Sequence, residues 1–156
     1  MKEYYDNPPP LIPPGKYELK YEGHVTKKIF TADKVYLFFR VASFGPDFGT
    51  ILARHYNCTL TGKPGWSGKF KAGWRSNLMR EFVGVTGRRP QRNDRVPLTN
   101  LGNFIVVGTV TTVEKGSDQS EIHRELQYSV ISRLEPALGP TPTPKPTPTE
   151  ASSERQ

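Results

Sequence analysis

The side chains of this sequence that could bind a ligand are aromatic rings and cations that alternate between residues 27 and 75. Lysine and arginine can contact the phosphates of a nucleic acid, and a flat ring can stack on any base. Phosphate contacts give an affinity that falls as the salt concentration rises. The pattern predicts a surface for single-stranded nucleic acid made by these residues: Lys27, Lys28, Phe30, Tyr36, Phe38, Arg40, Arg54, Tyr56, Lys63, Trp66, Lys69 and Arg75.

The positive charge of the chain is concentrated in one region. The 156 residues carry a formal charge of +7. Residues 54–95 hold ten Lys or Arg and two acids, a net charge of +8, so the remainder carries −1. Such an excess favours an anionic partner. Three arginines of this region belong to an expected exposed loop, and whether they share a groove with the aromatic residues is left open: Arg88, Arg89 and Arg92.

Enzymatic hypotheses find little support in the residue pattern, so we expect a binding protein without metal or cofactor. His24, His55 and His123 lack the spacing of metal ligands. A metal-dependent nuclease needs clustered carboxylates, and acids are sparse where the cations are dense. The glycines of TGKPGWSGK match neither a P-loop nor a dinucleotide fingerprint. The single cysteine, Cys58, is expected to be an unreactive strand residue.

Prolines divide the chain into three parts. Eleven of the 15 prolines lie near the two ends, where they disfavour helix and central strand. We expect a Pro-rich arm at 1–14, a folded domain at 15–135, and a disordered Pro/Thr-rich tail at 136–156 that could dock a protein partner. No apolar run reaches the ~20 residues of a membrane helix. The N-terminus has no apolar signal core, so a cytoplasmic protein without membrane contact is expected.

Alternation of apolar and polar residues predicts the first two strands. Residues 16–25 alternate over their whole length, with Tyr17, Leu19, Tyr21 and Val25 on the core side, and Gly23 suggests a bulge. In residues 34–42, one face continues the core and the other is aromatic and basic: Tyr36, Phe38 and Arg40. That second face is either a ligand surface or is buried beneath a loop, the N-terminal arm or a homodimer partner.

The middle of the chain predicts a third strand, a loop and a helix. The strand covers about 50–60, and neither face is clearly the inner one unless a bulge lies midway. From Phe70, apolar residues four apart predict a helix that ends near Gly84 or Gly87, with Trp74 in the core. Trp66 lies in a Gly-rich basic loop, where it either stacks on a base or covers one end of the fold.

Two more strands, at 103–113 and 122–134, complete the order β-β-β-α-β-β. This order, with one helix between strands three and four, is that of the OB-fold, a five-stranded barrel that binds ligands on strands two and three. An α+β sandwich remains an alternative. The acidic loop between the last two strands is not expected to contact phosphate.

Several segments together resemble a known family. PPGKYELKYEGHV, KVYLFFRVAS, GTILARHYNCTLTG, the basic helix and NFIVVGTVTTV resemble small phage- and plasmid-type single-stranded DNA-binding proteins with an OB-fold, over about residues 11–135. The resemblance implies that aromatic and basic residues of the barrel face hold the strand, here Tyr36, Phe38, Arg40, Arg54 and Tyr56. Wider relatives end in an acidic tip that recruits partners, whereas this chain ends EASSERQ.

These observations lead to one main hypothesis and two alternatives. The main hypothesis is a non-enzymatic protein that binds single-stranded DNA with little sequence preference and protects strands in replication or recombination. An RNA-binding regulator would use the same rings and charges. A protein-interaction or assembly module would instead use the basic face and the Pro/Thr tail.

Overall fold

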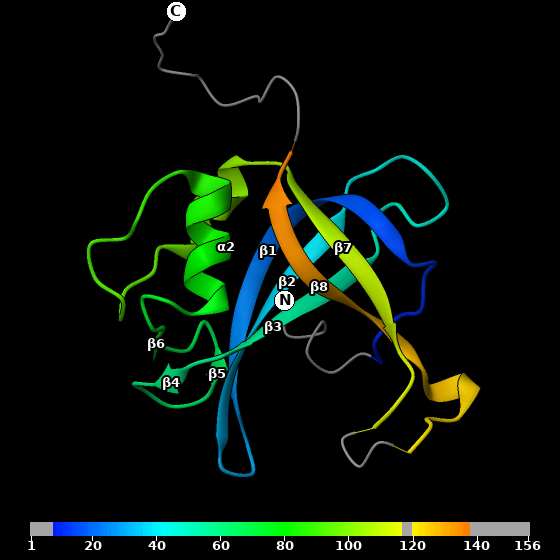
Figure 1. The fold of residues 1–156 in the computed structure, drawn as a ribbon, viewed down its shortest axis with the longest axis horizontal. Coiled ribbons are helices and arrows are strands. Elements are labelled where there is room, and N and C mark those ends of the chain that lie inside the picture. The colour runs from blue at the N-terminus through cyan, green and yellow to red at the C-terminus, as the bar shows by residue number, and fades with distance from the viewer. Residues whose placement is uncertain (1–7, 117–119, 138–156) are drawn as a thin grey trace, which may run out of the picture.

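The computed structural model describes residues 8–116 and 120–137, and these residues are mainly β structure (Figure 1). One antiparallel sheet has the strand order β3-β2-β1-β7-β8, and β5 pairs with β1 outside this path. A second sheet pairs β4 with β6. The strands are β1 (Gly15–Ile29), β2 (Ala32–Val41), β3 (Ile51–Asn57), β4 (Thr59–Leu60), β5 (Gly65–Trp66), β6 (Phe70–Lys71), β7 (Val106–Val113) and β8 (Tyr128–Pro136).

A single apolar core lies on the inner face of the large sheet. Figure 1 shows β7 and β8 running across β2 and β3, so the sheet curls around this core. The helix α2 (Asn77–Thr86) lies at one side, where it contacts β8 and the 3₁₀ helix η1 (Leu98–Asn103). Alternate residues of β2 are fully or almost fully buried in the core, as the sequence pattern predicts: Val35, Leu37, Phe39 and Val41.

A bulge in β1 changes which residues face the core. The pairing with β2 shifts register between Tyr21 and Gly23, so the bulge expected at Gly23 is present. Before the bulge, Leu19 and Tyr21 contact the core. After it, Val25 lies opposite Tyr36 on the outer face, and the expectation that Val25 belongs to the core side is wrong. A bulge inserts one residue, and side chains alternate every residue, so every later side chain of β1 changes face.

The inner face of β3 carries Leu52 and Tyr56, which are buried in the core. The pairing of β3 with β2 runs without a register shift from Ile51 to Asn57, so no bulge lies midway. His55 is therefore an outer-face residue that pairs with Tyr36.

The helix begins later than the apolar spacing predicts. Ser76 is the N-cap of α2, and its hydroxyl accepts a hydrogen bond from the Met79 amide at 3.2 Å. Gly87 ends the helix in the left-handed conformation, as expected from its type. Phe70 belongs to β6 instead. The expectation that Trp74 is a core residue is also wrong, because its side chain is 46% exposed, with Arg89 over its ring.

The large sheet does not close into the expected five-stranded barrel. It has six strands, and within the described residues no hydrogen-bonded pairing joins its edge strands β3 and β8, although these strands lie near each other. The N-terminal segment lies beside the start of β8. The Ser129 amide donates to the Pro10 carbonyl at 2.8 Å, and the Ser129 hydroxyl bonds to both the amide and the carbonyl of Ile12.

The ends of the chain fall partly outside the described residues. Residues 8–14 precede β1 without regular structure, and β8 ends at Pro136. The expected disordered tail, from residue 138 on, and residues 1–7 of the arm are not described. Within the described part of the chain, no helix has the length and apolar character needed to cross a membrane.

Candidate functional site

The outer face of β1, β2 and β3 gathers several aromatic residues that do not belong to the core. Phe38 pairs with Gly23 on one side and Ala53 on the other, and Tyr36 pairs with Val25 and His55. Phe38 is 6% exposed and Val25 is fully buried, yet neither is part of the core cluster. The outer face therefore has a small apolar cluster of its own.

Trp66 covers part of this cluster. Its strand β5 pairs with β1, which sets Trp66 opposite Val25. The indole stacks on the ring of Phe38, with 6.1 Å between the ring centroids and 16° between the planes. A Cβ atom on Gly23 would lie 2.6 Å from Cζ2 of this indole, so the bulge glycine provides the space for the ring. The structure places Trp66 on the outer face, where its ring covers Phe38, and its stacking on a base stays a prediction.

Four short contacts hold the Trp66 loop on β1. The buried Thr26 hydroxyl donates to the Gly65 carbonyl at 3.3 Å and accepts from the Gly65 amide at 3.1 Å. The Ser67 amide donates to the His24 carbonyl at 2.9 Å, and the His24 ring bonds to the Gly68 carbonyl. Burial lowers the pKa of His24 and so favours its neutral form. These hydrogen bonds hold the backbone on both sides of Trp66, at Gly65, Ser67 and Gly68, and so position its indole.

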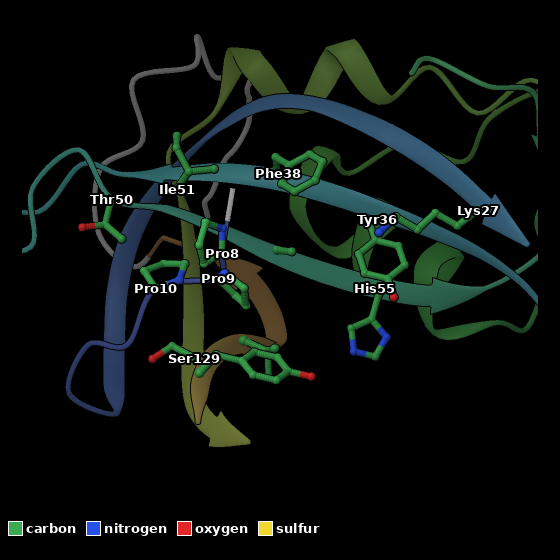
Figure 2. Close-up of a pocket in the computed structure, with 13 residues that line it drawn as sticks. Pro8, Pro9, Pro10, Lys27, Tyr36, Phe38, Thr50, Ile51, His55 and Ser129 are labelled. Atoms are coloured by element: carbon green, nitrogen blue, oxygen red, sulfur yellow. The ribbon is translucent and has the colours of Figure 1, made fainter. Parts of the chain in front are cut away.

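A cavity of about 580 Å³ opens on the outer face of β2 and β3 (Figure 2). In Figure 2, Pro8, Pro9 and Pro10 stand between Ile51 of β3 and Ser129 of β8, so the N-terminal segment forms one wall. None of the described residues that line the cavity is acidic. Its lining is mostly apolar and aromatic: Pro8, Pro9, Pro10, Lys27, Tyr36, Phe38, Thr50, Ile51, Ala53, His55, Tyr128, Ser129 and Val130.

Cationic and neutral nitrogen groups surround the Tyr36 ring at this cavity. The Lys27 ammonium lies 4.8 Å from the centre of the ring, and the His55 imidazole stacks on it at 5.3 Å. Partial burial lowers the pKa of His55, and the positive charges of Lys34 and Arg54 lower it further. Arg40 lies on the same face, but its guanidinium is 3.0 Å from Glu22, so its charge is partly neutralised.

Arg54 and Tyr56 do not share this face, and their assignment to the aromatic surface is wrong. The Arg54 guanidinium makes two hydrogen bonds to Glu81 of α2, at 2.8 and 3.1 Å, and the Tyr56 hydroxyl donates to the same carboxylate at 2.5 Å. Burial raises the pKa of Tyr56. Side chains alternate along a strand, so Tyr56 lies inside because Leu52 does. These residues connect β3 to the helix.

The remaining predicted residues lie away from the cavity. Lys28 pairs with Asp33 at 2.7 Å, and Phe30 occupies the tip of the β1–β2 hairpin with a positive φ of 56° and 95% exposure. Lys63 and Lys69 are exposed in the loop that carries Trp66.

The predicted arginines after Trp66 do not line this cavity either. Arg92 pairs with Asp94, Arg88 is exposed, and the Arg89 guanidinium lies 5.5 Å from the centre of the Trp74 ring. Arg75 lines a separate cavity at the start of α2.

The cavity also includes residues that sequence reasoning missed. His55 and Ala53 could have been assigned by placing Leu52 inside, since side chains alternate along a strand. Tyr128 and the three prolines come from segments far apart in the sequence, and no local pattern joins them to β2.

Neither a metal site nor a reactive cysteine is found among the described residues. In residues 8–116 and 120–137, no group of three or more His, Cys, Asp or Glu side chains could hold a metal ion. Cys58 is half-buried, and burial raises the pKa of its thiol to about 11, which keeps it in the unreactive thiol form at neutral pH.

Comparisons with known proteins found no match for this chain among family models, curated proteins or solved structures.

Proposed function

We propose that this protein binds single-stranded DNA without enzymatic activity and with little sequence preference, through the outer face of β2 and β3. Bases stack in the cavity beside Tyr36, Phe38 and Tyr128, while Lys27 contacts a phosphate. Coating of this kind protects strands during replication or recombination. This assignment places the protein with the phage- and plasmid-type class that its sequence segments resemble.

The cavity itself is the observation that carries this proposal. Aromatic rings line its walls, its described lining includes Lys27 and His55, and no acid lines it. Each base stacked on an aromatic side chain contributes roughly 1–3 kcal/mol, whatever the base. Stacking inside a cavity requires a base that is not paired within a duplex, which favours single strands over double-stranded DNA.

We also propose that the sheet is an OB-fold with an open edge. The five longer strands and α2 follow the OB order, with the helix after the third strand. The proximity of β3 and β8 supports this order, because the two edge strands lie near each other although no hydrogen-bonded ladder joins them within the described residues. The docked residues Pro10 and Ile12 support the same idea, because they satisfy backbone and hydroxyl groups at the start of β8.

Fluorescence anisotropy of labelled oligo-dT, measured at several salt concentrations, tests the function. We expect binding at low salt that weakens steadily as salt is added, because phosphate contacts release counterions. A duplex of equal length should bind more weakly. Absence of binding at low salt, or an affinity that does not change with salt, would overturn the proposal.

RNA is the second candidate ligand, because aromatic rings and cations of this kind can bind either nucleic acid. Competition between DNA and RNA oligonucleotides of the same length and sequence distinguishes them. We expect DNA to compete at least as well as RNA. A clear preference for RNA would assign the same face to an RNA-binding regulator.

A further inference from the structure

A second cavity, of about 430 Å³, lies where the end of β3 meets the start of α2. Its walls are polar, in contrast to the aromatic walls of the first cavity. It is lined by Lys34, His55, Tyr56, Asn57, Arg75, Ser76 and Asn77. No acid is among these residues.

Two cations of this cavity lack an acidic partner among the described residues. In the described part of the chain, neither Lys34 nor Arg75 has a carboxylate within ion-pair distance. The Lys34 ammonium donates to the Asn57 side-chain oxygen at 2.5 Å, which keeps it at the cavity wall without neutralising it. Glu81 accepts from Arg54 and from the Tyr56 hydroxyl. The cavity therefore presents two uncompensated positive charges, and its chemistry suits an anion.

The two cavities share one residue, His55. On the paired strands, Tyr36 lies opposite His55, and Lys34 lies opposite Asn57. The polar pair is thus two residues further along the same outer face, a step of about 7 Å. A chain that leaves the first cavity past His55 reaches Lys34 and Asn57 next. This continuity favours a ligand that has both rings and regularly spaced anions.

We propose that the second cavity is a phosphate subsite for the strand whose bases occupy the first cavity. The DNA strand then crosses β3 at His55 and continues toward the start of α2. This inference rests on the proposed function and adds the direction of the strand and the cations at its end. It also gives a role to Arg75, which lines the second cavity and not the aromatic one.

The test compares two double variants in the oligo-dT titration. Lys34→Gln with Arg75→Gln removes the two cations of the cavity. Lys16→Gln with Arg133→Gln removes the same charge from β1 and β8, at positions that line neither cavity. We expect the first variant to bind roughly tenfold more weakly at low salt and to reduce the slope of log affinity against log salt by about 1. The control variant should lose less affinity at low salt, and its slope of log affinity against log salt should change by less.

A second measurement needs no variant. Amide NMR signals of Asn57, Ser76 and Asn77 in the wild-type protein should shift when oligo-dT of about 8 nucleotides is added, a length within the range that one OB-fold covers. They should shift less with inorganic phosphate at the same concentration of phosphate groups, because a free ion lacks the stacked bases that hold the strand.

The outcomes separate this inference from the proposed function. If oligo-dT binds but the two double variants behave alike and the three amides do not move, the phosphate subsite is wrong and the aromatic site stands. If the amides respond to oligo-glutamate or to inorganic phosphate but not to oligo-dT, the cavity belongs to a different ligand, and the inference is overturned. If the wild-type protein does not bind oligo-dT, both proposals fail together.

Discussion

The indole of Trp66 lies nearly parallel to the ring of Phe38, and this stack joins β5 to the outer face of β2. It exists because Gly23, opposite Phe38, has no side chain at the point where the indole crosses β1. A loop and a strand bulge that are about 40 residues apart in the sequence thus depend on one another.

Replacing Gly23 by alanine should displace the indole. The new Cβ would approach Cζ2 of Trp66 to 2.6 Å, and φ at this position is +155°, which favours glycine. We expect the free energy of unfolding to fall by about 1–3 kcal/mol and the tryptophan emission to move to longer wavelength. Gly84→Ala is the matched control, because nothing lies within 4 Å of its Cβ position on α2. Helix propensity predicts that the control gains stability. Equal behaviour of the two variants in urea denaturation would contradict this account of Gly23.

Substitutions of two tyrosines on neighbouring strands should affect different quantities, one mainly the affinity for oligo-dT and the other mainly the stability of the fold. Tyr36→Leu removes a ring from the cavity and should weaken oligo-dT binding by roughly tenfold, with little change in stability. Tyr56→Phe removes a hydroxyl that donates to Glu81, and should lower the free energy of unfolding by about 1–2 kcal/mol, while its affinity for oligo-dT should fall less than that of Tyr36→Leu because the Tyr56 ring stays in place. Urea denaturation and oligo-dT titration of both variants measure the two quantities. A loss of affinity in Tyr56→Phe as large as that in Tyr36→Leu would contradict the separate roles of the two residues.

The affinity for oligo-dT should increase as the pH falls. In the free protein the pKa of His55 is lowered by burial and by nearby positive charge, so the ring is neutral at pH 7. A bound phosphate favours the imidazolium and raises this pKa, so binding takes up a proton in the acidic range. We expect the affinity for oligo-dT to increase as the pH is lowered from about 7 to about 5, and to increase less in His55→Gln. The same slope in both proteins would exclude His55 as the cause.

The lowered pKa of His55 has the opposite consequence for stability. The unfolded chain binds the proton more readily than the folded one, so the contribution of His55 to stability is fully present above the ordinary histidine pKa. It is lost as the pH falls through that value toward the folded pKa. The free protein should therefore become less stable over the same range in which it binds more tightly. Thermal unfolding with and without oligo-dT measures both effects.

Ser129→Ala should release the N-terminal segment from β8. The hydroxyl accepts from the Ile12 amide and donates to the Ile12 carbonyl, and Ser129 is 2% exposed. Its removal leaves buried polar groups without partners and should cost about 1–3 kcal/mol of stability. Limited proteolysis should then cut near residues 8–14 faster than in the wild-type protein. An unchanged cleavage rate would show that the segment is held by other contacts.

The sequence predicted those elements that local alternation determines. The core face of β2 follows from Val35, Leu37 and Phe39 alone, because these apolar residues occupy alternate positions of the strand. The bulge at Gly23 was also predictable. Its consequence for Val25 and Lys27 was not, because a change of face depends on where the extra residue is accommodated against β2.

Other features depend on contacts between distant segments. Phe70 and Trp74 continue the four-residue spacing of Leu78 and Phe82, but Phe70 belongs to a strand that pairs with β4. The Ser76 cap was a local signal for the later helix start. The wall formed by Pro8–Pro10 requires tertiary packing, which a single sequence does not encode in any short pattern. The buried position of Tyr56 follows from alternation only once Leu52 is known to face the core.

Tryptophan emission during titration with oligo-dT tests the central claim most directly, because the chain has two tryptophans and Trp66, unlike Trp74, stacks on Phe38 of the proposed site. Trp74→Phe leaves Trp66 as the emitter, and Trp66→Phe leaves Trp74. The account predicts that oligo-dT quenches the wild-type protein and Trp74→Phe strongly, and Trp66→Phe much less. Quenching that persists in Trp66→Phe and disappears in Trp74→Phe would contradict it, as would the absence of quenching in the wild-type protein.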